Sequence, residues 1–397
     1  MGFMSSFFKK ILFLLLIGFV LSVNSQQNNI KLNGLVVDAN NEPIPYAAVG
    51  ILSKSIGTST TEEGRFFLLI PSSLKNNFIK VSSLGFKTYK IKVEDFLNQP
   101  EKKIILTETV MSLDEIVISI KPSDYVNKAL KSLKKNTLSR KHQLKILYRR
   151  FSGEDGKARF FVEHFMNVLD RGPSATDLGK IAVIEGRRSA DYRFVKMKQH
   201  SHSINYMSGN NPLRNGFNIK DYKWKKIGDT SYNDEDVLII EGSTNKGKYR
   251  KIKLYIDLES FKIYRFETSS PWLKTLYVYK ENKNGKLHLN YHNRKMTRKE
   301  PLTKMQKMRL NTKAEKIQVS YSHEVYVLGV ETNKDKMNFK SFGGWGIDIG
   351  DVDITYNPVF WNNFSIPPAT KFYKKNIKEL ESIFGVPLEV QFKTVNK

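Results

Sequence analysis

Residues 32–51 read LNGLVVDANNEPIPYAAVGI, and residues 57–71 read GTSTTEEGRFFLLIP. In both stretches, short apolar runs alternate with clusters of Asn, Asp, Glu and Gly, which are typical turn residues. The same alternation continues in IKVSSLGFKTYKIKV at residues 79–93. Short strands at such spacing are typical of a β-sandwich. We therefore expect a seven-stranded β-sandwich over residues 30–120.

The seven expected strands are short apolar runs separated by turn residues. They cover residues 32–37, 45–52, 66–70, 78–84, 86–93, 103–106 and 115–120. Gly64 and Gly85 stand between successive runs, where a turn requires a residue that accepts a positive φ. We assign both glycines to turns rather than to a ligand-binding loop.

The three quoted segments resemble the carboxypeptidase-like regulatory domain, which is a transthyretin-like seven-stranded sandwich. The segment SLDEIVIS at residues 112–119 resembles the end of that domain. The domain is found beside metallocarboxypeptidases, on secreted Gram-negative surface proteins and as the N-terminal extension of many TonB-dependent receptors. The resemblance implies a domain without catalytic activity that mediates interaction or assembly.

The spacing of the histidines shows whether the chain could hold the zinc ion of a carboxypeptidase. A zinc carboxypeptidase needs a His and a Glu close in sequence together with a distant His. None of the seven histidines begins an H-x-x-E motif. The pairs His200 with His202 and His288 with His292 could each share one face of a strand, but such pairs arise by chance in a chain of this size. The absence of cysteine excludes disulfides, thiol nucleophiles and cysteine-bound zinc. We predict no catalytic residue, no cofactor and no metal site.

The N-terminus carries an export signal. Lys9 and Lys10 precede the apolar run ILFLLLIGFVLSV at residues 11–23, and Val23 and Ser25 stand at the −3 and −1 positions of a cleavage before Gln26. A bilayer-spanning helix needs roughly 20 apolar residues, so this run is too short to span. Its basic start and small-residue end are typical of a signal peptide. We expect a signal peptide over residues 1–25 and a periplasmic or outer-membrane-associated location.

The net charge is strongly positive, with 65 Lys and Arg against 39 Asp and Glu, giving +26. Export and the lack of a nucleic-acid-binding motif argue against a nucleic-acid partner. The expected partners are an envelope protein or glycan, with peripheral contact to anionic outer-membrane components. Eight basic residues gather in residues 295–316, which we expect to form a long mobile loop or an irregular helix.

The rest of the chain is predicted to be an antiparallel β-rich domain over residues 140–397, joined to the sandwich by a linking helix over residues 121–139. Its expected strands are residues 145–151, 159–169, 236–242, 251–258, 261–268, 275–281, 286–292 and 318–330, followed by a short helix at 376–384. The fold class is therefore mainly β, an N-terminal sandwich followed by a larger antiparallel β-rich domain with a few helices.

One strand shows the alternation that this prediction uses. In KLHLNYH at residues 286–292, Leu287, Leu289 and Tyr291 are expected on one side of the sheet. His288, Asn290 and His292 are expected on the other side. Such alternation indicates a sheet that is buried on one side only.

An aromatic and acidic stretch near the C-terminus is the candidate ligand site. It reads GGWGIDIGDVDITYNPVFWNNFSIPP at residues 343–368. Aromatic rings with acidic partners suit carbohydrate binding, because sugars stack their C–H faces on aromatic rings. The candidate ligand-binding residues are Trp345, Asp348, Asp351, Asp353, Tyr356 and Trp361. The alternative is an aromatic core strand followed by a loop.

These observations lead to one hypothesis with two alternatives. We expect a secreted, non-catalytic cell-envelope protein whose sandwich mediates interaction or assembly. Its C-terminal β-domain is expected to bind an envelope component or a glycan. The alternatives are a carboxylate-dependent hydrolase in the C-terminal domain and a small outer-membrane β-barrel.

Overall fold

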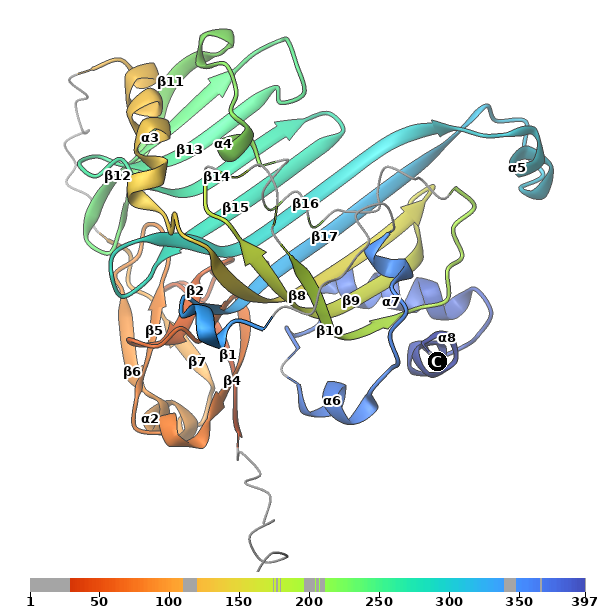
Figure 1. The fold of residues 1–397 in the computed structure, drawn as a ribbon, viewed down its shortest axis with the longest axis horizontal. Coiled ribbons are helices and arrows are strands. Elements are labelled where there is room, and N and C mark those ends of the chain that lie inside the picture. The colour runs from red at the N-terminus through yellow and green to blue at the C-terminus, as the bar shows by residue number, and fades with distance from the viewer. Residues whose placement is uncertain are drawn as a thin grey trace, which may run out of the picture.

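The computed structural model describes residues 29–109, 120–173, 180–195, 211–338, 348–364 and 366–396, with the single residues 175, 178, 204 and 207 (Figure 1). It contains sheets of three, four and ten strands, which confirms the mainly β fold class. The expected signal peptide and almost all of the strand expected at 115–120 lie outside the described residues.

The N-terminal domain is a sandwich of two small sheets with seven strands. One sheet has the order β4-β1-β7, formed by β1 (Asn29–Val37), β4 (Arg65–Pro71) and β7 (Lys103–Ile105). The other has the order β3-β2-β5-β6, formed by β2 (Ala48–Ile51), β3 (Gly57–Ser59), β5 (Phe78–Ser82) and β6 (Tyr89–Lys92). Alternating apolar side chains of both sheets form its core, together with Phe96 of the helix α2 (Val93–Asn98).

The second domain is built on one antiparallel sheet with the order β10-β9-β8-β17-β16-β15-β14-β13-β12-β11. Its first three strands are β8 (His142–Glu154), β9 (Lys157–Asp170) and β10 (Ile181–Arg188). The others form a meander of β11 (Lys223–Tyr232), β12 (Glu235–Ser243), β13 (Lys251–Asp257), β14 (Ile263–Ser270), β15 (Leu273–Glu281), β16 (Leu287–Pro301) and β17 (Lys316–Glu331). Strands β10 and β11, which the sequence did not predict, are the edges of this sheet.

Helices and loops cover both faces of the large sheet. The helix α3 (Pro122–Asn136) packs Tyr125, Val126 and Ala129 onto one face. The C-terminal helices α6 (Pro358–Asn363), α7 (Lys371–Ser382) and α8 (Leu388–Val395) contribute to the apolar cluster on the other. None of the helices in the described ranges is long and apolar enough to cross a bilayer.

The expectation of a sheet buried on one side only is wrong in β16. The alternation assigns His288, Asn290 and His292 to the solvent side, but all three are at most 7% exposed. A β-bulge also changes the expected alternation, because Tyr279 pairs with Leu289 while Val278 pairs with Tyr291. Asn290 is the extra residue, and a single extra residue reverses the facing of all side chains that follow it.

The bulge separates residues that the alternation places together. Leu287 and Leu289 belong to the core under α3, whereas Tyr291 packs with Leu147 and Tyr326 in the core that includes the C-terminal helices. The prediction that the two leucines and Tyr291 share one side is therefore wrong.

A buried ion triad lies between the sheet and these helices. The Glu163 carboxylate accepts hydrogen bonds from Nε of Arg149 at 2.7 Å and from Nε of Arg187 at 2.8 Å. The rings of Tyr373 and Trp361 each lie 4.4 Å from one of the two guanidinium groups. Burial by itself raises the pKa of Glu163, but the two guanidinium groups hold that pKa below its usual value.

Replacing Glu163 tests the contribution of this triad. Glu163→Gln leaves two buried guanidinium groups without their carboxylate, so we expect the free energy of unfolding to fall by roughly 3–5 kcal/mol. The measurement is urea denaturation at neutral pH. The matched control is Glu94→Gln, which breaks the exposed pair of Lys75 and Glu94 and should leave the midpoint nearly unchanged. Equal midpoints for the two variants would contradict the assigned role of Glu163.

Candidate functional site

The sandwich packs directly against the middle of the large sheet. Its strand β3 lies beside β16 and β17, and Ile56 forms a β-bridge with Gly329. The ring of Tyr46 stacks on Tyr291 with ring centroids 4.8 Å apart. The side-chain amide nitrogen of Asn290 donates to Oγ of Ser59, so the extra residue of the bulge contributes to the contact between the two domains.

A second contact joins the sandwich to the turn between β11 and β12. The Gly85 amide donates to the Ser231 carbonyl at 2.8 Å, and Oγ1 of Thr88 donates to Oδ1 of Asn233 at 2.8 Å. Gly85 has φ 84° and Gly64 has φ 70°, which confirms the assignment of both glycines to turns. The two contacts hold the domains together on both sides of a hollow.

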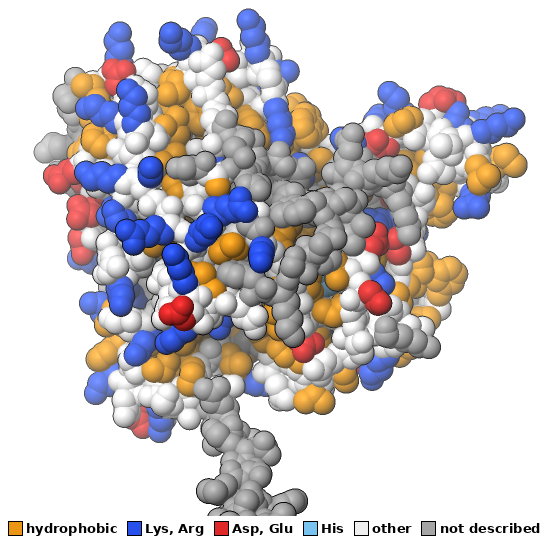
Figure 2. All heavy atoms as spheres, in the orientation of Figure 1, with side chains coloured by type: hydrophobic (Ala, Val, Ile, Leu, Met, Phe, Trp, Pro, Cys, Tyr) orange, Lys and Arg blue, Asp and Glu red, His pale blue; other side chains and the backbone are white. Residues whose placement is uncertain are grey.

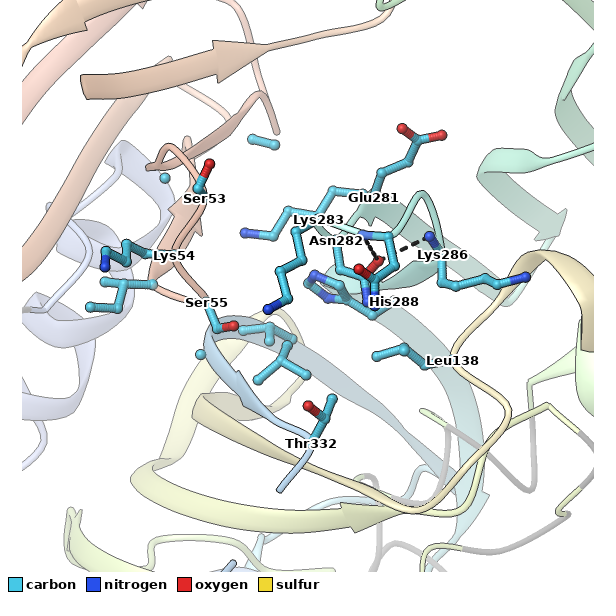
Figure 3. Close-up of a pocket in the computed structure, with 18 of the residues that line it drawn as sticks. Ser53, Lys54, Ser55, Leu138, Glu281, Asn282, Lys283, Lys286, His288 and Thr332 are labelled. Carbon is cyan, nitrogen blue, oxygen red and sulfur yellow. Dashed lines mark hydrogen bonds between the residues drawn. The ribbon is translucent and has the colours of Figure 1, made fainter. Parts of the chain in front are cut away.

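That hollow is a cavity of about 770 Å³ between the two domains (Figure 3). The sandwich supplies β2 and the loop at residues 52–56. The large domain supplies residues 137–142, the β15–β16 hairpin at 280–288 and the end of β17. A cavity of this size is within the range of small-ligand sites in proteins.

The cavity wall is strongly basic. Its positive residues are Lys54, Lys80, Arg140, Lys141, Lys280, Lys283 and Lys286, and its one acidic residue is Glu281. Glu281 is already paired with Nζ of Lys262 at 2.6 Å and accepts a hydrogen bond from the Tyr264 hydroxyl. In Figure 3 the Glu281 carboxylate points away from the space beside Ser55 and His288. The cavity therefore carries a positive charge that its own wall does not neutralise.

Lys280 is the lysine most affected by its surroundings. Its ammonium group lies against Gly57 of β3, where a Cβ atom on that glycine would come within 2.5 Å of Nζ. Among the described residues, no hydrogen-bond acceptor or carboxylate pairs with Lys280. Burial lowers the pKa of Lys280 to about 8, because the charged form loses hydration.

The histidine beside Lys280 is neutral. Nδ1 of His288 lies 2.8 Å from its neighbour's carbonyl oxygen at Leu289. Burial and then the nearby charge of Lys280 lower the pKa of His288 to about 3. Because a carbonyl oxygen only accepts, Nδ1 carries the single proton of this neutral ring, and Nε2 is left as an acceptor that adds no charge to the site. The arrangement suits an anion such as a phosphate or a carboxylate.

The residues that the sequence singled out lie elsewhere. Asp348 pairs with Arg150 at 2.7 Å and with Arg193 at 3.2 Å, on the sheet face that carries α3. Burial alone would raise the pKa of Asp348, but the Arg150 guanidinium and the amide of Gly350 lower it. Asp351 and Asp353 are exposed nearby, and Trp345 lies outside the described residues.

Tyr356 and Trp361 lie on the opposite face of the sheet. Trp361 is 2% exposed against Arg187, and the Tyr356 hydroxyl donates to the Glu389 carboxylate at 2.9 Å. The chain reaches this face by passing the edge strand β10, where Asn357 donates to Glu185. The five predicted residues that the structure describes therefore do not share one surface, and the role of all six in ligand binding stays a prediction.

Sequence reasoning missed the basic cavity because its wall comes from distant segments. The local signal was the group Lys280, Lys283 and Lys286 around a turn that ends at Gly285. A lysine-rich turn is common on protein surfaces and does not show that another domain packs over it. Only the contact of the sandwich with β16 and β17 brings Lys54 and Lys80 to the same space.

Comparison with known proteins identifies the N-terminal domain. Residues 32–118 match the family model of the CarboxypepD_reg-like domain, so the chain contains this domain, joined to a ten-stranded antiparallel sheet. A relative is the TonB-dependent receptor SusC of Bacteroides thetaiotaomicron, which is 30% identical over 113 residues. The match covers 28% of this chain and 10% of the receptor, so the chain spans about a tenth of that relative.

Two solved structures are similar to part of the chain. A LolA superfamily protein from Nitrosomonas europaea is 15% identical, with 56% of this chain and 99% of that chain covered and a TM-score of 0.26. A DUF1329 family protein from Desulfovibrio piger is 11% identical, with 52% and 94% covered and a TM-score of 0.26. Scores this low define neither the fold nor the function of the large domain.

The lowered pKa of Lys280 predicts a pH dependence of stability. The unfolded chain holds the Lys280 proton up to about pH 10.5 and the folded chain only up to about pH 8. Stability therefore rises between these values, by at most about 3 kcal/mol at 1.4 kcal/mol per pKa unit. Lys280→Met should lack this rise in urea denaturation at pH 7.5 and 10.5. The control is Lys274→Met at an exposed position of the same strand, and parallel pH profiles for both variants would refute the assignment.

Proposed function

We propose that this chain is a non-catalytic binding protein of the cell envelope, and that the basic cavity between its two domains holds an anionic envelope component. The observation that carries the proposal is the excess of lysine in a cavity whose one acidic residue is already paired with Lys262. Lysine ammonium groups bind phosphate and carboxylate groups as point charges. The ligand class is thus a molecule with a phosphate or carboxylate group, such as a lipid head group or an acidic glycan.

Three observations support an envelope location. The sequence predicts a signal peptide at residues 1–25. The N-terminal domain belongs to a family that the sequence resemblance associates with secreted surface proteins. Its relative SusC is a TonB-dependent receptor. Together they favour a protein that acts beside outer-membrane components.

The role proposed for the sandwich follows from its contribution to the cavity. Lys54 and Lys80 come from the sandwich, whereas Lys280 and Lys283 come from the large domain. An anion bound between them contacts both domains and stabilises their contact by mass action. The sandwich would thus act in assembly by supplying one wall of the site.

The aspartates on which the hydrolase alternative rests, Asp348, Asp351 and Asp353, do not show the features of a catalytic pair. Glycoside hydrolysis needs two facing carboxyl groups, one with a raised pKa that acts as the acid. Asp348 has a lowered pKa and is held by two arginines, while Asp351 and Asp353 are exposed. These features favour binding over hydrolysis.

Calorimetric titration tests the proposed site. The probes are inorganic phosphate, glycerol 3-phosphate and an oligogalacturonate, which separate phosphate from carboxylate recognition. We expect the double variant Lys280→Met with Lys283→Gln to bind the preferred probe at least about tenfold more weakly, because each lost charged contact costs about 1.5–3 kcal/mol. The control is Lys274→Gln with Lys378→Gln, which removes the same charge from exposed positions. Equal loss in both double variants, or no binding by the wild type, would refute the proposal.

The pH profile of the same titration gives a second test. Lys280 must be protonated to attract an anion, so affinity should fall as pH rises through about 8. His288 titrates near pH 3 and stays neutral throughout this range. Lys280→Met should therefore bind weakly with little change between pH 7 and pH 9. A similar fall in this variant would place the titrating group elsewhere.

A further inference from the structure

The β16–β17 hairpin extends beyond the rest of the molecule as an arm. Figure 1 shows these two strands continuing past their neighbours and ending in the short helix α5 (Lys304–Arg309). The expectation of a mobile loop or an irregular helix at residues 295–316 is wrong, because β16 pairs with β17 as far as Pro301 and Lys316. We call residues 298–316 the arm tip.

The arm tip is a built structure. Thr303 and Gln306 form a capping box at the start of α5, and the Gln306 side chain also donates to the Phe194 carbonyl at 3.0 Å. Leu302 is buried and packs in an apolar cluster with Met296, Val319 and other residues along the hairpin. These contacts fix the orientation of α5 relative to the strands.

Two methionines of α5 take no part in this packing. Met305 and Met308 are 63% and 72% exposed, whereas the nearby Leu302 is 8% exposed. Residues three apart lie on the same side of a helix, so the two side chains form one apolar surface at the end of the arm. Methionine is flexible and is often found on surfaces that bind apolar partners.

Basic side chains surround this apolar surface. The basic residues of the arm tip are Arg298, Lys299, Lys304, Lys307, Arg309, Lys313 and Lys316. Its two acidic residues are already paired, Glu300 with Arg298 and Glu315 with Lys307. Figure 2 shows blue side chains beside orange ones at this projection. The arm tip thus carries an excess of five positive charges around two exposed methionines.

We propose that the arm tip is a membrane-docking element that inserts Met305 and Met308 into the surface of an anionic bilayer. The lysines would then lie at the lipid phosphates, where their charges are attracted to the anionic surface. Two methionines on a short helix offer far less area than the 1,200–2,000 Å² of a specific protein interface. A bilayer needs no such area, because it accepts isolated apolar side chains beside basic ones.

Vesicle binding by the whole chain tests the proposal. The probes are vesicles of phosphatidylglycerol mixed with phosphatidylcholine, and vesicles of phosphatidylcholine alone. We expect the wild type to co-sediment with the anionic vesicles only, and the binding to weaken as salt is raised. Met305→Ser with Met308→Ser should bind at least about tenfold more weakly, because serine gains almost nothing from burial in the apolar part of the bilayer.

Matched variants separate the arm from other surfaces. Val359→Ser with Phe384→Ser removes two equally exposed apolar side chains from the C-terminal region and should bind like the wild type. The arm variant Met305→Ser with Met308→Ser should bind the calorimetric probe of the cavity like the wild type, so failure of the cavity proposal and failure of the arm proposal are distinguishable. Equal vesicle binding by the wild type and the arm variant, or no binding by the wild type, would overturn the inference.

Insertion itself has a direct readout. The sequence contains no cysteine, so Met308→Cys provides a single site for an environment-sensitive fluorophore. We expect its emission to shift to the blue on addition of anionic vesicles, because the fluorophore enters an apolar environment. The same label at Val359→Cys should not shift. An unchanged emission at both positions would show that the arm tip does not insert.

Discussion

The pairing of β17 with β8 is the interaction on which the large domain depends. It joins His142–Glu154 to Lys316–Glu331, two segments that are far apart in the chain, along almost their full length. Through it the strands β8, β9 and β10 become part of the same sheet as the meander of β11 to β17. Because β17 also pairs with β16 and contacts β3 of the sandwich, both domains are aligned on this one strand.

Charged groups buried beside the large sheet are paired with opposite charges, whereas the cavity lysines are not neutralised by the cavity wall. On one face of the sheet, Arg149 and Arg187 both form ion pairs with Glu163. On the other face, Arg150 and Arg193 both form ion pairs with Asp348. Buried charges are expected to be paired in this way, since an unpaired charge in an apolar interior is costly. The lysines of the interdomain cavity depart from this pattern, which is why the cavity is the better candidate for a site that receives its counter-charge from outside.

The sequence predicted what depends on local pattern and missed what depends on contacts between distant segments. The long runs of β9 and β17 were predicted to within two residues of each end, and β8 was predicted only in its central part at residues 145–151. The strand β3 has the sequence GTS, which contains no apolar pattern, and it becomes a strand through its neighbours. The bulge at Asn290 has no local signal either, because Asn290 contacts Ser59 of the other domain, which is distant in the sequence. The cavity was missed for the same reason, because its wall comes from distant segments. The sequence also predicted Asp348 and Trp361 to share one surface, whereas they lie on opposite faces of the sheet.

The length of the β16–β17 hairpin has a consequence for what the protein can reach. The basic cavity is lined by the first residues of β16 and the last residues of β17, at one end of this hairpin. The arm tip with α5 lies at the other end (Figure 1). With β17 at 16 residues and a rise of roughly 3.3 Å per residue, the two ends are roughly 50 Å apart. That separation exceeds the roughly 30 Å hydrocarbon thickness of a bilayer. If the arm tip docks on a membrane as proposed and the hairpin stands upright, the hairpin would act as a spacer that holds the cavity outside the lipid layer.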